Sequence, residues 1–219
     1  MLYSNDIRDC NKFAQASADN LHRAAVFVLA TIQQQLETVP VAMNDMLDRG
    51  VSSKYAWGAK PRGLAYLEAH KNELYSDAMV ARDRPAALLE VFLVVPGMAL
   101  VKAGFLCQIF AGHVGCIDLH NVKMYDVSRA DVRYEPAKPE TMLRKREQYV
   151  ALCDGLGGAH ALWSRWCDYV AALRPKNWAS GADVSRFHFE VISGIETGGI
   201  VDLFSDVEYD PTFKQELTQ

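Results

Sequence analysis

Apolar residues recur every three to four positions along most of this chain. That spacing is typical of α-helices with one buried face, whereas a half-buried strand alternates at every second position. No segment shows convincing strand alternation. The pattern predicts helices over 6–37 (as one helix or two), 41–49, 63–80, 88–95, 101–110, 119–124, 139–150, 161–173 and 183–192. We therefore expect an all-α fold of roughly six to nine helices with short connections.

The central motif of the chain, residues 88–125, contains two long hydrophobic runs separated by a break. The runs, 88–95 and 101–110, are so apolar that protein must enclose most of both. Pro96 and Gly97 lie between them, and proline lacks the N–H that a helix interior requires. The pattern therefore predicts a helix, a tight hairpin and a second helix.

Asp118 directly precedes the short helix expected over 119–124. Aspartate is favoured at this position because its carboxylate accepts hydrogen bonds from the free N–H groups of the first helical turn. From this pattern alone, Asp118 is either a helix cap or a functional carboxylate.

The segments Val95-Pro96-Gly97-Met98-Ala99 and Ile117-Asp118-Leu119-His120 together resemble the helix-hairpin-helix DNA glycosylase superfamily, which includes endonuclease III and the 8-oxoguanine DNA glycosylases. That family has a Leu-Pro-Gly-Val-Gly hairpin, a helix, a loop, and a Val-Asp-Thr-His or Val-Asp-Val-His segment with the catalytic aspartate. The resemblance covers roughly forty of the 219 residues. It implies a glycosylase-like helical bundle of two closely joined lobes within one domain, 1–219. It also implies a catalytic Asp118, with His120 as a further candidate.

The chain departs from the family at the lysine that bifunctional members use as a nucleophile, two residues after the second hairpin glycine. Ala99 occupies the position of that glycine, so Val101 falls where the lysine would be. Lys102 is one residue further on, which rotates a helical side chain by about 100°. Lys102 would reach the site only if the hairpin contained an extra residue, and otherwise points to solvent or to a phosphate. A glycosylase without a lysine Schiff base is therefore favoured.

Two segments are candidates for binding DNA. In the hairpin, backbone N–H groups around Gly97, Ala99 and Val101, helped by Lys102, would bind phosphate oxygens. The loop before residue 63 interleaves basic and aromatic side chains, which can bind phosphates and stack on bases. Its candidates are Lys54, Tyr55, Trp57, Lys60 and Arg62. Alternatively, Tyr55 and Trp57 attach this loop to the core.

Composition limits these interpretations. The formal net charge of −4 argues against a broad basic surface, although hairpin N–H groups need few basic side chains. The five cysteines form no Cys-x-x-Cys pair, which favours reduced thiols. We expect no metal or cofactor, because no metal-ligand spacing is present. With no apolar run of membrane-spanning length and no signal-peptide pattern, a cytoplasmic protein with no membrane association is expected. The acidic tail from about 197 to 219 is expected to cover the fold or to hang loosely.

Three functions follow from these observations. The first is a DNA glycosylase that hydrolyses the N-glycosidic bond of a flipped, damaged or modified base, with Asp118 as the catalytic carboxylate. The second, suggested by viral relatives of the superfamily, is a transferase of phage thymine hypermodification, in which an amino acid or polyamine displaces a group on a pyrimidine in DNA. Asp118 would then deprotonate the amine. The third is a non-catalytic DNA-binding module. DNA is the expected partner in all three.

Overall fold

The computed structural model describes residues 4–135 and 137–195. Within these residues the chain forms eleven α-helices, two short 3₁₀ helices and no strand, so the predicted all-α class is confirmed. The helices are α1 (Ser4–Gln15), α2 (Ala18–Ala30), η1 (Leu36–Thr38), α3 (Val39–Arg49), η2 (Gly50–Ser52), α4 (Lys60–Ala81), α5 (Pro85–Leu93), α6 (Leu100–Phe110), α7 (Leu119–Met124), α8 (Arg129–Val132), α9 (Pro139–Gly155), α10 (Gly158–Leu173) and α11 (Gly181–Ser193). The predicted acidic tail lies outside the described residues.

Each predicted helix is present, with three differences of detail. The segment 6–37, expected as one helix or two, forms two, and the second ends at Ala30 rather than at residue 37. Ser17 caps this second helix by accepting a hydrogen bond from the backbone N–H of Asn20. The helix predicted over 41–49 begins at Val39, so Pro40 lies in the first turn of α3, where its missing N–H costs no helical hydrogen bond. The one-turn helix α8 forms between the helices predicted over 119–124 and 139–150, where no helix is predicted.

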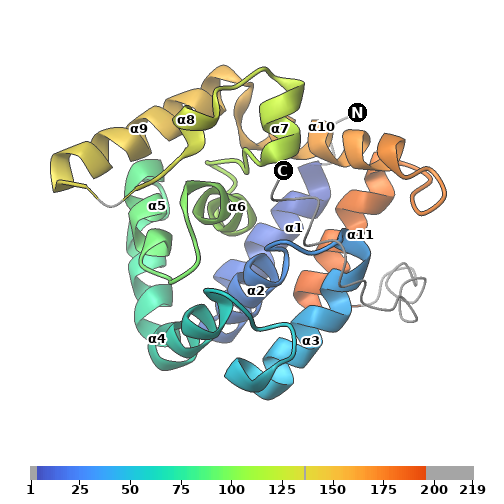
Figure 1. Cartoon of the computed structure of the whole chain (residues 1–219), viewed down its shortest axis with the longest axis horizontal. Helices are drawn as coiled ribbons and strands as arrows, with labels where there is room; N and C mark the ends of the chain where they lie inside the picture. Colours follow the sequence, from blue (N-terminus) through green and yellow to red (C-terminus); the bar gives the residue numbers. More distant parts are fainter. Residues whose placement is uncertain (1–3, 136, 196–219) are drawn as a thin grey trace.

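Helix α6 occupies the centre of the structure (Figure 1) and packs against α1, α2 and α5. Its side chains from Ala103 to Phe110 are all buried. A helix that is apolar on every side is stable only when other elements surround it completely. Helix α2 packs against α3 and α4, and α4 packs against α5, which makes one group of helices; α1, α10 and α11 pack together as a second group. Helix α9 contacts both α5 and α10.

The predicted hairpin joins α5 to α6 and turns at Gly97, whose φ angle of +91° favours glycine. The hairpin lies against the start of α4. A Cβ atom on Gly63 would lie 2.5 Å from the carbonyl oxygen of Pro96, and one on Gly97 would lie 3.3 Å from the Cβ of Ala59. This contact explains the glycine at position 63, because any side chain there would push the hairpin away.

The replacement Gly63→Ala tests this packing. We expect it to lower the free energy of unfolding by about 1–3 kcal/mol, because the new methyl group meets a backbone carbonyl that cannot move without shifting the hairpin. Gly155→Ala is the matched control, since a Cβ atom there has no neighbour within 4 Å. Urea unfolding should place the control within about 1 kcal/mol of the parent protein. Equal stability of the two variants would contradict the close contact.

Candidate active-site cavity

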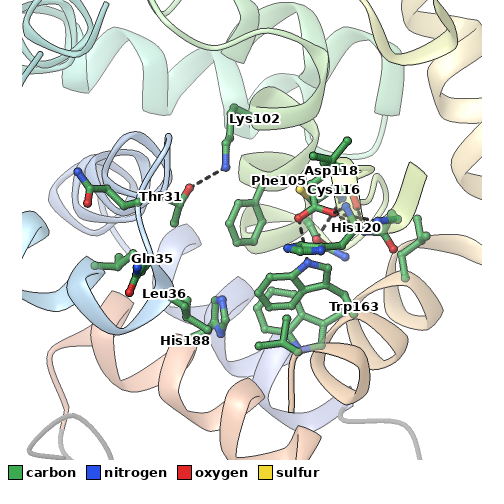
Figure 2. A pocket seen from close by; sticks show the side chains of 18 of the residues that line it. Thr31, Gln35, Leu36, Lys102, Phe105, Cys116, Asp118, His120, Trp163 and His188 are labelled. Carbon is green, nitrogen blue, oxygen red and sulfur yellow. Dashed lines mark hydrogen bonds between the residues drawn. The ribbon is translucent and has the colours of Figure 1, made fainter. Parts of the chain in front are cut away.

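A cavity of about 450 Å³ opens between the two groups of helices (Figure 2). Residues at the end of α2, the loop before α3, helix α6, the loop before α7, and helices α10 and α11 line it. Phe105, Trp163, Trp166 and His188 contribute aromatic walls. Of the residues that the sequence marks as catalytic candidates, Asp118, Lys102 and His120 all line this one cavity. The segment 98–120 thus contributes both helix α6 and the loop before α7 to one site.

Asp118 is the N-cap of α7, as predicted, and its two carboxylate oxygens have different partners. Oδ1 accepts hydrogen bonds from the backbone N–H groups of His120 (2.9 Å) and Asn121 (3.0 Å). Oδ2 accepts a hydrogen bond from the indole Nε1 of Trp166, at 2.9 Å. Three donors from two helices therefore fix the orientation of this carboxylate at the cavity wall.

Buried polar groups hold the loop that precedes Asp118. The Tyr149 hydroxyl donates to the carbonyl oxygen of Gly115 and accepts from the N–H of Ile117, each at 3.0 Å. Burial raises the pKa of Tyr149 well above its ordinary value, so the hydroxyl stays neutral. Gly104 permits this approach, because a Cβ atom there would lie 2.7 Å from the Gly115 carbonyl oxygen. On the other side of the loop, the Gln108 carboxamide accepts from the N–H of Cys116, at 3.2 Å.

Asn121 was not marked by the sequence, yet it supports Asp118 directly. Its Nδ2 donates to the carbonyl oxygen of Cys116 (2.8 Å) and lies 3.4 Å from Asp118 Oδ1. Its Oδ1 is buried, and has no hydrogen-bond partner among the described residues. A buried acceptor without a partner is costly, so a bound molecule that donates to it would be stabilised here.

The register of Lys102 relative to the family predicts that its side chain points to solvent or to a phosphate. The structure shows a different direction. Its ammonium donates to Thr31 Oγ1 at 2.9 Å and lies 5.7 Å from the centre of the Phe105 ring. Figure 2 shows Lys102 pointing into the cavity towards Thr31. Helix α6 begins at Leu100, and Lys102 in its first turn faces the cavity. The direction predicted for the Lys102 side chain is therefore wrong.

His188 is 1% exposed and also lines the cavity. Its Nδ1 donates to the carbonyl oxygen of Val184 at 2.7 Å, because a carbonyl can only accept. The ring makes edge contacts with Trp163 and Trp166. Burial lowers the pKa of His188 to about 4, and nearby Lys102 adds to this effect. The ring is therefore neutral at pH 7, and its Nε2 is a hydrogen-bond acceptor.

The basic and aromatic loop before α4 does not form the exposed surface predicted from its sequence. Tyr55 is 5% exposed and Lys60 is 1% exposed, and the Lys60 ammonium lies 4.6 Å from the centre of the Trp57 ring. The prediction that Tyr55 and Lys60 contact DNA is therefore wrong, because core packing covers both. Lys54 and Arg62 are exposed.

Two further side chains at the cavity bear on its chemistry. His120, half-buried, has its ring 5.4 Å from that of Tyr169. Burial raises the pKa of the Cys116 thiol far above its ordinary value, so this cysteine is a neutral wall residue and not a nucleophile. The five cysteines are free thiols.

No protein-family model, curated protein or solved structure matches this chain. Over the described parts of the chain, no group of three or more His, Cys, Asp or Glu residues could hold a metal ion. None of the helices described above is both long and apolar enough to cross a membrane. The chemistry of the cavity therefore has to be inferred from its own residues.

The neutral, buried His188 predicts a pH-dependent stability. The unfolded chain takes up this proton near pH 6.5, whereas the folded protein resists it until about pH 4. Stability is therefore full above pH 6.5 and falls as the pH drops towards 4, by about 2 kcal/mol between pH 7.5 and pH 5.

The variant His188→Phe should lose this part of the pH dependence in urea unfolding at the two pH values. Part of the dependence should remain, since burial also lowers the pKa of His22 and of His160. Identical pH dependence in the variant and the parent would show that His188 is not held neutral by the fold.

Proposed function

We propose that this chain is a DNA-acting enzyme of the helix-hairpin-helix glycosylase type, which hydrolyses the N-glycosidic bond of a base extruded from the duplex. The observation that carries the proposal is the joint placement of Asp118 and Lys102 on one aromatic-walled cavity. An anion and a cation facing one enclosed space suit a reaction that creates a positive sugar and a negative leaving base.

The hairpin supports binding to a DNA backbone. Gly97 and Ala99 are exposed, and no side chain caps the N-terminus of α6. The first backbone hydrogen bond of this helix runs from the N–H of Ala103 to the carbonyl of Ala99, so the preceding N–H groups of the first turn remain for another acceptor. Phosphate oxygens are good acceptors at such a position. Binding of this kind is compatible with a net charge of −4, because backbone groups supply the donors.

The cavity has the size and the walls that an extruded base requires. Its volume of about 450 Å³ lies within the range of roughly 300–1,000 Å³ that is typical of small-molecule sites. The aromatic side chains Phe105, Trp163 and Trp166 offer faces and edges to a planar ring. Extrusion of a nucleotide from a duplex costs a few kcal/mol, which contacts inside this cavity would offset.

In the proposed reaction the bond between C1′ of the sugar and the base nitrogen breaks, and its electron pair leaves with the base. The Asp118 carboxylate stabilises the positive charge that develops on the sugar. Water then attacks C1′ and loses a proton, with Asp118 as the acceptor. The unpartnered Oδ1 of Asn121, beside Asp118, would accept a hydrogen bond from this water. The Lys102 ammonium favours the negative charge on the departing base.

The transferase alternative has less support from the cavity. Its charged lining residues are Lys102, Asp118 and Arg174, and Arg174 is already paired with the buried Glu37. A polyamine carries several positive charges and would meet a single carboxylate among the described lining residues, together with the Lys102 ammonium. A module without catalytic activity would not need the indole of Trp166 directed at Asp118.

The variant Asp118→Asn tests the catalytic role. Asparagine is as good an N-cap as aspartate, so the fold and DNA binding should be retained. The rate should fall by about 10² to 10⁴, the scale of a positioned acid–base group. The measurement is mass spectrometry of bases released from duplexes that each carry one altered base, such as uracil, 8-oxoguanine or 5-hydroxymethyluracil. Parallel reactions with spermidine or free amino acids would detect transfer instead. Full activity in the folded variant would remove Asp118 from the mechanism.

The variant Ala99→Glu tests the hairpin. A carboxylate at this exposed turn should repel phosphates, weaken binding to unrelated DNA sequences to the same extent, and reduce the salt dependence of the remaining affinity. Ala99→Gln is the matched control, because it has nearly the same size and no charge. Fluorescence anisotropy at several salt concentrations measures both effects. Equal affinities for Ala99→Glu and Ala99→Gln would place DNA elsewhere on the protein.

A further inference from the structure

Beyond Asp118, the cavity contains a second set of polar groups that no step of the proposed hydrolysis uses. His188 and Gln34 both line it. Figure 2 shows His188 beside the Gln35–Leu36 segment on one side of the cavity, with Asp118 and His120 on the other. His188 therefore lies across the cavity from the carboxylate, and Gln34 directly precedes Gln35 in the chain.

His188 presents a fixed acceptor. The hydrogen bond from Nδ1 to Val184 sets the tautomer, which leaves the lone pair of Nε2 for a donor in the cavity. Five aromatic contacts, with Phe27, Phe105, Trp163, Trp166 and Phe187, prevent the ring from turning. An acceptor that cannot turn and cannot gain a proton near neutral pH selects for an N–H or O–H donor.

One end of the Gln34 carboxamide already has a hydrogen-bond partner. One end of its carboxamide lies 3.3 Å from Thr38 Oγ1, and the other end, assigned as Nε2, is buried with no partner among the described residues. Rotation of the carboxamide by half a turn exchanges its oxygen and its nitrogen, so this end can accept or donate a hydrogen bond. It therefore suits a donor or an acceptor that lies next to the ring N–H of a base. A buried polar group without a partner favours a ligand that satisfies it.

The charges of the cavity bear on the class of base that it would accept. Arg174 is paired with the buried Glu37, so Lys102 is the cation of the lining without a carboxylate partner among the described residues, and the one carboxylate of that lining, Asp118, is already hydrogen-bonded by the backbone and Trp166. A cationic base, such as an N-alkylated purine, would meet the Lys102 ammonium and a neutral histidine. An uncharged base meets no such penalty.

We infer that the cavity selects an uncharged nucleobase by the hydrogen-bonding edge that it uses in base pairing, with His188 accepting its ring N–H and Gln34 binding the neighbouring polar group. This inference rests on the proposed function, because it names the base that would be extruded. The N–H of thymine at N3 and that of guanine at N1 are both donors of this kind. Their N-methyl derivatives lack the donor but remain uncharged.

The experiment compares duplexes in which thymine, 3-methylthymine, guanine or 1-methylguanine lies opposite a tetrahydrofuran abasic analogue. None of these bases is paired, so the methyl group does not change the cost of losing a pairing partner. Binding is followed by fluorescence anisotropy and by quenching of protein tryptophan fluorescence, since Trp163 and Trp166 line the cavity. In at least one pair, the parent protein should bind the unmethylated base roughly tenfold more tightly. His188→Phe should abolish this preference.

Gln34→Leu, at a half-buried position, tests the same edge without disturbing the core. It should weaken binding of the preferred duplex several-fold. A duplex with an abasic analogue on both strands is the control, and the parent and both variants should bind it equally. Equal affinity for methylated and unmethylated bases, or an unchanged preference in folded His188→Phe, would overturn the inference and leave the proposed function standing. Failure of the parent protein to bind any duplex would overturn both.

Discussion

The arrangement of the cavity depends on one buried phenol, that of Tyr149. Its hydroxyl bridges the Gly115 carbonyl and the Ile117 N–H, and thereby fixes the turn that delivers Asp118 to the cavity wall. The bridge requires the hydroxyl to remain protonated, which burial ensures by raising the pKa of Tyr149. It also requires a glycine at position 104, because any side chain would separate α6 from the loop. The central helix α6 therefore helps to determine where the catalytic candidate lies.

The cavity also accounts for the lysine that α6 carries among so many apolar residues. Lys102 is the charged residue of this helix, and its ammonium reaches across to Thr31 at the end of α2. A solvent-exposed ion would contribute little to recognition, whereas a cation at an enclosed cavity acts through a lower effective dielectric constant. Lys102 and Asp118, the two oppositely charged groups of the proposed site, are thus each held by a partner from another segment, so their positions depend on how the helices pack.

The sequence predicts the helices well and the cavity only in part. Periodicity identifies α6 and the hairpin because both are local patterns, and the position of Asp118 before α7 follows from capping chemistry. The direction of Lys102 is not predictable in this way, since it depends on a contact with Thr31 of another segment. Trp166 gives no signal beyond an apolar stripe, because its indole meets Asp118 across 48 positions of sequence. The roles of Asn121 and Gln34 likewise cannot be predicted from the sequence, because they depend on the neighbours of these residues in the folded structure.

Capping and catalysis are not competing explanations for Asp118, because the two carboxylate oxygens have separate partners. The cap uses Oδ1, which accepts from the first turn of α7, and an N-cap needs no more than this. Oδ2 adds nothing to the helix, yet the Trp166 indole from α10 holds it at the cavity. A side chain that served only as a cap would leave this oxygen to solvent, where hydration is inexpensive. Fixing both oxygens restricts the carboxylate to one orientation, which preorganised stabilisation of a positive charge requires.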